Sequence, residues 1–242
     1  MTHSDLAALR GEPSYVWREG QERRLQMIAE WLPLQGAHIF IDGCGIGMYA
    51  SQIARRYQAK VDALDIELDR IQIARNEIPR ALVAAGEYLP YVDNCFDGIL
   101  SHEVIEHVND DRLSAQEMIR VLKPGGRIIL FCPNRWYPFE THGHYWKGEY
   151  HFGNTPLINY LPDKFRNQLA PHVRAYTSNQ IRSLFESDET KIIYHTRIYG
   201  GYDNIIARAG KVGRLMRDFL YAIEKTPLRN LGLSHFLVVE KL

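Results

Sequence analysis

The stretch that decides the fold is His38-Ile-Phe-Ile-Asp-Gly-Cys-Gly-Ile-Gly47, a short apolar run followed at once by three glycines at alternate positions. The run predicts a buried strand over 38–42, and the residues after the glycines predict a helix through Tyr57. Because glycine has no Cβ, the turn between these elements can be tight and can lie close to a ligand. Ligands of open α/β sheets bind at the carboxyl ends of the strands. We therefore expect a ligand-binding α/β fold.

Outward from this stretch, short apolar strands alternate with amphipathic helices. Seven strands are expected, at residues 38–42, 61–65, 81–84, 96–101, 127–131, 191–195 and 235–240. Helices are expected before Pro33, at 48–57, 68–77 and 110–122, after Thr177 and at 205–223, with a tight turn at 123–126. Such alternation implies parallel strands joined by right-handed crossovers. The prediction is an α/β, doubly wound, mostly parallel seven-stranded sheet, whose final strand can enter antiparallel.

The chain is expected to be a single domain over 1–242 with four parts. These are a helical segment (1–36), a ligand-binding core (37–132), a lid insertion (133–176) and the C-terminal half of the sheet (177–242). The segment from Pro133 to Tyr176 holds ten Phe, Trp or Tyr residues and four His residues. That composition is too aromatic for a solvated loop, so an ordered lid is expected.

Composition narrows the class of protein. Lys and Arg total 29 and Asp and Glu total 29, so no strong global field attracts nucleic acid. Three cysteines without a Cys-x-x-Cys pair argue against a disulfide scaffold and a structural zinc site. The residues 1–10 have no apolar stretch typical of a signal peptide, and no run approaches the ~18 apolar residues of a membrane span. A cytoplasmic enzyme is the expected class.

The glycine loop also restricts its ligand. In a dinucleotide-binding loop the third glycine would fall at Met48, which makes an oxidoreductase the weaker alternative. The loop also lacks the Lys-Ser/Thr ending of a nucleoside-triphosphate site. Asp65 follows Gly47 by 18 residues at the end of the second strand, where a carboxylate can bridge two ribose hydroxyls. The alternative for Asp65 is a helix cap. These features favour a nucleoside-like ligand without a pyrophosphate.

Taken together, the motifs resemble those of the class I S-adenosylmethionine-dependent methyltransferases, of the small-molecule type that includes the ubiquinone and menaquinone biosynthesis enzymes. The resemblance covers about residues 38–133. It rests on Ile41-Asp-Gly-Cys-Gly-Ile-Gly47, Leu64-Asp65, Gly86-Glu-Tyr-Leu-Pro90, Phe96-Asp97, Glu103-Val-Ile-Glu-His107 and Leu122-Lys-Pro-Gly-Gly126. It implies a Rossmann-like methyltransferase fold, with S-adenosylmethionine as cofactor and S-adenosylhomocysteine as product.

The resemblance also implies roles for individual residues. Three glycines approach the methionine and ribose, Asp65 holds the ribose, Ile66 packs on adenine, and the Gly86 segment lies at the adenine amino edge. The full set expected at the cofactor is Asp42, Gly43, Cys44, Gly45, Gly47, Asp65, Ile66, Gly86, Glu87, Ser101 and Glu103. Two positions depart from the family pattern. The acid usually two residues before the first glycine is Ile41 here, with Asp42 displaced by one, and the usual acid at the adenine edge is Ala85.

Methyl transfer is an in-line displacement that depends mainly on proximity, with a base needed only where the acceptor loses a proton. His107 and His102 are the candidate catalytic bases, and the alternative is that they stabilise the turn before the next helix. In the lid, the expected substrate residues are Arg135, Trp136, Tyr137, His144 and Trp146. These aromatics can equally form the lid's own core. Glu140, His142, His144 and His151 can also be interpreted as metal ligands, but no metal is expected.

The helix at 205–223 carries Arg208, Lys211, Arg214 and Arg217 beside an apolar stripe. We expect it to cover the sheet with its charges in water; the alternative is peripheral contact with an anionic membrane. The leading function is methylation of a small-molecule acceptor, aromatic or lipid-like, at oxygen or carbon, without a nucleic-acid partner. The alternative is a non-catalytic S-adenosylmethionine-binding module of the same fold.

Overall fold

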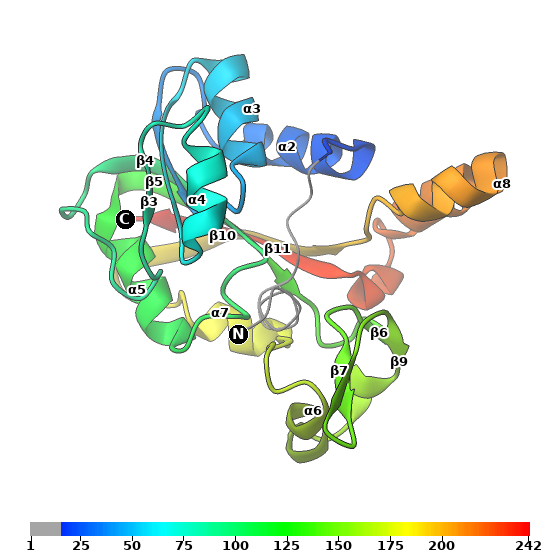
Figure 1. The fold of residues 1–242 in the computed structure, drawn as a ribbon. Helices are drawn as coiled ribbons and strands as arrows, with labels where there is room; N and C mark the ends of the chain where they lie inside the picture. Colours follow the sequence, from blue (N-terminus) through cyan, green and yellow to red (C-terminus); the bar gives the residue numbers. More distant parts are fainter. Residues whose placement is uncertain (1–15) are drawn as a thin grey trace.

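The computed structural model describes residues 16–242; the start of the N-terminal segment and the signal-peptide question lie outside the described residues. A seven-stranded sheet in the order β10-β11-β5-β4-β1-β2-β3 crosses the molecule (Figure 1). Its strands are β1 (His38–Asp42), β2 (Lys60–Asp65), β3 (Ala81–Val83), β4 (Phe96–His102), β5 (Leu122–Pro133), β10 (Thr190–Ile198) and β11 (Ser234–Lys241). β11 pairs antiparallel with both β5 and β10, whereas the other neighbours pair parallel. The predicted fold is confirmed.

The helices lie on both faces of this sheet, in the lid and, for the last one, away from the sheet. They are α2 (Glu19–Trp31), α3 (Met48–Tyr57), α4 (Leu68–Ala74), α5 (Asp111–Val121), α6 (Asp163–Leu169), α7 (Ser178–Ser183) and α8 (Asp203–Ile223), with 3-10 helices η1 (Ile158–Tyr160) and η2 (Pro227–Leu231). As predicted, Thr177 caps α7, since its hydroxyl accepts from the N–H of Gln180. The carboxylate of Asp110 caps α5 in the same way.

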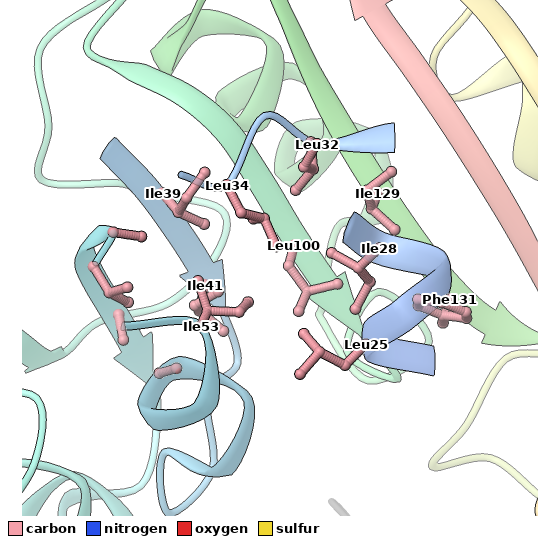
Figure 2. Packing of buried hydrophobic residues seen from close by; sticks show 14 of the residues in the cluster. Leu25, Ile28, Leu32, Leu34, Ile39, Ile41, Ile53, Leu100, Ile129 and Phe131 are labelled. Carbon is pink, nitrogen blue, oxygen red and sulfur yellow. The ribbon is translucent and has the colours of Figure 1, made fainter. Parts of the chain in front are cut away.

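The core explains why the strands are nearly continuous apolar runs. Figure 2 shows Leu25 and Ile28 of α2 packed beside Leu100 of β4 and Phe131 of β5, all of them buried. A second buried cluster fills the opposite face, beneath α5 and α7. A strand covered on both faces has no side that gains from polar residues. Among residues 16–242, no helix is long and apolar enough to cross a membrane.

The predicted turn at 123–126 lies inside β5. Leu122 pairs with Phe96 and Arg127 pairs with Gly98, so four residues of β5 stand opposite a single residue of β4. Gly125, with φ +77°, allows the chain to loop out there. The strand therefore begins earlier than the sequence pattern suggests.

The lid, residues 133–176, contains two small antiparallel pairs and one short helix apart from the central sheet (Figure 1). The strands of these pairs are β6 (Phe139–Glu140) with β9 (Thr155–Pro156) and β7 (His144–Trp146) with β8 (Glu149–His151).

The expectation that α8 covers the sheet is wrong. α8 projects away from the body of the molecule (Figure 1), and within it only Gly213 is buried. It is also two helices rather than one, because Gly210 adopts φ 53°, ψ −120° and breaks the helical backbone. The segments then pack on each other at Gly213, where a Cβ would lie 2.9 Å from the Cα of Ile206. The apolar side chains repeat at helical spacing through Gly210, so the sequence pattern predicts one helix and not this hairpin.

Candidate active site

The glycine loop between β1 and α3 has a backbone that glycine alone adopts readily. Gly43, Gly45 and Gly47 have φ of +67°, +55° and +88°. A Cβ on Gly43 would also lie 2.2 Å from Cγ2 of Val104, and one on Gly47 would lie 3.2 Å from the Cβ of Ala74. The loop therefore packs tightly on the neighbouring segments. Its backbone lies at the carboxyl edge of the sheet.

Asp65, the last residue of β2, fixes the shape of this loop. Its Oδ2 accepts the N–H of Gly45 at 2.8 Å and its Oδ1 accepts the N–H of Glu67 at 2.9 Å. Each carboxylate oxygen can accept a second hydrogen bond. The side chain lines the cavity described below, so the predicted position beside a ribose fits the structure.

Asp42 lies at the end of β1 and is buried. Its Oδ2 accepts from the hydroxyl of Ser101 at 2.9 Å, while its Oδ1 has no hydrogen-bond partner among the residues described. Burial raises the pKa of Asp42 to about 6, against a smaller opposing effect from Ser101. A Cβ on Gly86 would lie 3.0 Å from that oxygen. An unsatisfied buried acceptor at the cavity wall suits a ligand that carries N–H or O–H donors.

Two other predicted cofactor residues are placed differently from the expectation. Ser101 does not line the cavity; it is fully buried and reaches the site only through Asp42. Glu87 lines the cavity, but its Oε1 accepts the N–H of Asn109 at 2.7 Å and that of Asp110 at 3.3 Å. Its carboxylate thus holds the turn before α5. Ile66 is about half exposed at the cavity, where an apolar side chain can pack on a ring.

The glycine loop, Asp42, Asp65, Ile66 and Glu87 line a cavity of about 560 Å³, a typical size for a small-ligand site. One side is the glycine loop with Asp65 and Ile66, and the other is formed by residues after β4 and by the lid. A second cavity of about 240 Å³ shares the walls formed by Glu103, Thr141 and His142. Cys44 also lines the larger cavity, and burial raises the pKa of its thiol to about 12, so it is an inert part of the turn.

The two predicted catalytic histidines line this cavity but are poor bases. Nη1 of Arg24 lies 2.5 Å from Nε2 of His102, so the guanidinium donates to the nitrogen that would take a proton. Burial and Arg24 lower the pKa of His102 to about 3. Burial, with His142 nearby, lowers the pKa of His107 to about 4, and its Nδ1 donates to the carbonyl of His172 at 3.2 Å. Both rings are neutral at neutral pH, and their catalytic role stays a prediction.

The carboxylates after β4 lie in different environments. Glu103, at φ +55°, accepts from the hydroxyl of Ser234 at 2.7 Å and lies 3.7 Å from Arg24. Burial opposes ionisation, but the charge of Arg24 prevails and lowers the pKa of Glu103. Burial and the charge of Glu103 raise the pKa of Glu106 well above its ordinary value. Neither oxygen of Glu106 has a hydrogen-bond partner among the described residues.

Glu106, His107 and His142 each offer a ligand atom, and these atoms lie within 4.8 Å of one another. Carboxylate oxygen and imidazole nitrogen are donors that Zn²⁺ binds. The cluster differs from the predicted one, since Glu140 and His144 have other partners and His151 is exposed. A metal-free site stays a prediction.

None of the five predicted substrate residues lines either cavity. Arg135 pairs with Asp163 at 2.8 Å, and Trp136 and Trp146 are exposed. Tyr137 is buried in the lid itself, and His144 bonds to Thr155 at 2.9 Å and stacks on His151. They belong to the lid's own packing or to its outer surface. This alternative was left open at the sequence level.

The lid residues that do reach the larger cavity are Thr141, His142, Tyr150 and Phe152. His142 is held by a buried ion pair between Glu140 and Arg166. Its Nδ1 and its backbone N–H lie 3.1 and 3.0 Å from Oε1 of Glu140, and Oε2 of Glu140 accepts from Nη2 of Arg166 at 2.8 Å. Burial opposes ionisation of Glu140, yet these contacts hold its pKa at about 2. The chain of three side chains presents an imidazole to the cavity.

The sheet order, the glycine loop after β1 and the acid at the end of β2 define the architecture of a class I methyltransferase. The cofactor that this class implies fits these residues, since Asp42 offers an unsatisfied buried acceptor and Asp65 lines the same cavity beside the glycine loop.

Sequence comparisons agree. Residues 42–130 match the family described as "Methyltransferase domain". An O-methyltransferase of Penicillium expansum is 32% identical over 106 residues, which are 40% of this chain and 38% of that protein. A ubiquinone biosynthesis O-methyltransferase of Xylella fastidiosa is 32% identical over 119 residues, 46% of this chain and 48% of that protein. The chain thus spans less than half the length of these two relatives. Residues 42–130 are therefore similar to methyltransferase domains.

A solved structure shows that the likeness in fold extends further along the chain. An S-adenosylmethionine-dependent methyltransferase from Mesorhizobium loti has a TM-score of 0.64 with 17% identity, over 91% of this chain and 97% of that one. At this identity the similarity concerns the fold alone. It includes the sheet beyond residue 130, where the family match ends.

Proposed function

We propose that the chain transfers a methyl group from S-adenosylmethionine to a hydroxyl oxygen of a small, largely apolar acceptor and releases S-adenosylhomocysteine. The observation that carries the proposal is that one cavity joins the glycine loop to the lid and has His142 in its wall. The relatives named O-methyltransferases support oxygen as the methyl acceptor.

The two ends of the cavity suit two ligands. The cofactor end would consist of the glycine loop, Asp42, Asp65 and Ile66. Asp65 would bind the ribose hydroxyls, and the buried Oδ1 of Asp42 would accept a hydrogen bond from a donor group of the ligand. The acceptor end would consist of Tyr150 and Phe152 from the lid with residues after β4. Aromatic walls favour a flat or apolar acceptor and exclude water.

His142, in place of His102 and His107, is the proposed base. Because Nδ1 faces Glu140, Nε2 is the nitrogen left for the acceptor. When bound, S-adenosylmethionine supplies a methyl group on a sulfonium. Nε2 of His142 would accept the proton that the acceptor hydroxyl loses when it is methylated. Glu140 stabilises the resulting imidazolium, and Arg166 keeps Glu140 ionised.

The test begins with calorimetric titration of the protein with S-adenosylmethionine, S-adenosylhomocysteine and NADH. We expect the first two to bind and NADH not to bind. Transfer of a labelled methyl group is then measured on phenols and quinols. His142→Gln should leave cofactor affinity unchanged and lower kcat by about 10²- to 10⁴-fold, the range for a lost acid–base catalyst.

The matched control is His151→Gln, a lid histidine that is exposed outside the cavity; it should have wild-type kcat. If the folded protein binds neither sulfur ligand, the proposed function is wrong. If it binds them but methylates no hydroxyl acceptor, the alternative of a cofactor-binding module replaces it. Full turnover by His142→Gln would remove His142 from the mechanism and leave the function standing.

A further inference from the structure

The outer face of the α8 hairpin is an apolar stripe exposed to solvent. Val212, Leu215 and Phe219 follow at helical spacing on one side of the second helix, with exposed fractions of 72%, 72% and 61%. Ile205 of the first helix is also exposed. Large side chains repeated on one helical face normally pack on a partner. Among residues 16–242, nothing covers this stripe.

The opposite side of the hairpin is fixed to α2 by polar contacts. Arg217 pairs with Glu19, and Arg23 pairs with Glu224 while its guanidinium lies 3.9 Å from the ring centre of Tyr221. These contacts hold the hairpin away from the sheet and turn the stripe outward. The exposure of the stripe is therefore a consequence of how α8 is anchored.

Charge beside the stripe is strongly one-sided. Within α8 the sequence has four cations and two acids, Asp203 in the first turn and Asp218, which pairs with Arg217. The other three, Arg208, Lys211 and Arg214, are exposed and form no ion pair within 4.0 Å in the described part of the chain. The helix that carries the apolar stripe thus has a net charge of +2, and three of its cations are exposed without an acidic partner among the described residues.

We propose that the α8 hairpin docks on the surface of an anionic lipid bilayer. The stripe would enter the boundary between headgroups and acyl chains, and Arg208, Lys211 and Arg214 would contact the lipid phosphates. A second copy of the chain fits less well, because a two-fold contact through this face would bring the same cations together. The proposal is independent of the proposed methyl transfer.

The experiment is flotation of the purified protein with two kinds of vesicle, phosphatidylcholine alone and phosphatidylcholine mixed with phosphatidylglycerol. We expect binding to the mixed vesicles only, weakened by high salt. Lys211→Glu/Arg214→Glu should weaken binding at least about 25-fold, since each cation near an anionic surface contributes roughly five-fold. Leu215→Ser/Phe219→Ser should abolish it. Both pairs are exposed, and thermal unfolding checks that each variant is folded.

The matched control is Lys60→Glu/Lys191→Glu, two exposed cations at the starts of β2 and β10, which should bind like the wild type. The proposal is overturned if the wild type fails to float with anionic vesicles, if it floats equally with neutral ones, or if the control loses binding as much as the α8 variants. It is also overturned if light scattering shows a dimer that Leu215→Ser/Phe219→Ser dissociates, because a second copy then covers the stripe.

Discussion

Replacement of Glu140 by Gln tests the buried chain that holds the lid histidine. In the wild type the carboxylate has an exposed fraction of 3% and lies 2.8 Å from Nη2 of Arg166, whose side chain is equally buried. The amide keeps the shape of the carboxylate but removes its charge. Arg166 is then left in the interior without a counter-ion. Breaking a buried pair from one side costs about 3–5 kcal/mol.

The acidity of Glu140 gives an independent magnitude. A fall in its pKa from the ordinary 4.5 to about 2 corresponds to about 3 kcal/mol of stabilisation of the charged form in the folded state. We therefore expect Glu140→Gln to lose about 3 kcal/mol in free energy of unfolding at pH 7, measured by urea titration. Because the folded pKa is depressed, this contribution is complete above pH 4.5 and is lost as pH falls toward 2.

The difference between wild type and variant should therefore shrink by about 1.4 kcal/mol between pH 7 and pH 3.5. Glu149→Gln, an exposed lid carboxylate, is the control and should lose nothing. Glu140→Gln/Arg166→Met removes both charges and should recover most of the loss. A loss under 1 kcal/mol, or a difference that does not change with pH, would refute the reasoning.

Four further predictions concern the site. Asp65→Ala should weaken S-adenosylmethionine binding by about 1–3 kcal/mol in calorimetry, the scale of a lost buried hydrogen bond; unchanged affinity would remove the ribose assignment. His107→Ala should leave cofactor affinity and the acidic limb of the pH–rate profile unchanged, because burial already keeps this ring neutral; a shifted limb would make His107 the base. Gly43→Ala should abolish cofactor binding. Gly36 has nearly the same φ but open space around it, so Gly36→Ala should cost only about 1–2 kcal/mol in free energy of unfolding. Equal effects of the two substitutions on cofactor affinity would exclude the packing argument. Chelation with EDTA should leave kcat unchanged. A loss of kcat that a divalent ion reverses would assign a metal to the cluster of Glu106, His107 and His142.

The sheet was predictable because its determinants are local. Each strand is an apolar run, each helix has its own periodicity, and caps such as Asp110 and Thr177 can be identified from a few neighbouring residues. The α8 hairpin was not predictable in this way. Its apolar periodicity continues through Gly210, and the break depends on a backbone conformation that the residue type permits but does not require.

The candidate site also has a part that could be predicted from the sequence and a part that could not. The convergence of the glycine loop and Asp65 on one cavity was predictable, because residues a short distance apart in the chain meet at one sheet edge. The choice of base could not be made, because it depends on distant neighbours: Arg24, on α2, occupies the nitrogen of His102. Likewise, Arg166 reaches Glu140 across 26 residues, and nothing in the local sequence connects them.

The boundary of the family match has a consequence for the acceptor. The match ends at residue 130, whereas the lid begins at residue 133. The shared part therefore contains the glycine loop and Asp65, the cofactor half of the proposed site, while Glu140, His142 and the cavity aromatics lie outside it. Part of the proposed acceptor end, the lid residues, therefore lies outside the family match, and only the residues after β4 lie within it. If His142 is the base as proposed, the Glu140–His142 pair favours an acceptor group that gives up a proton.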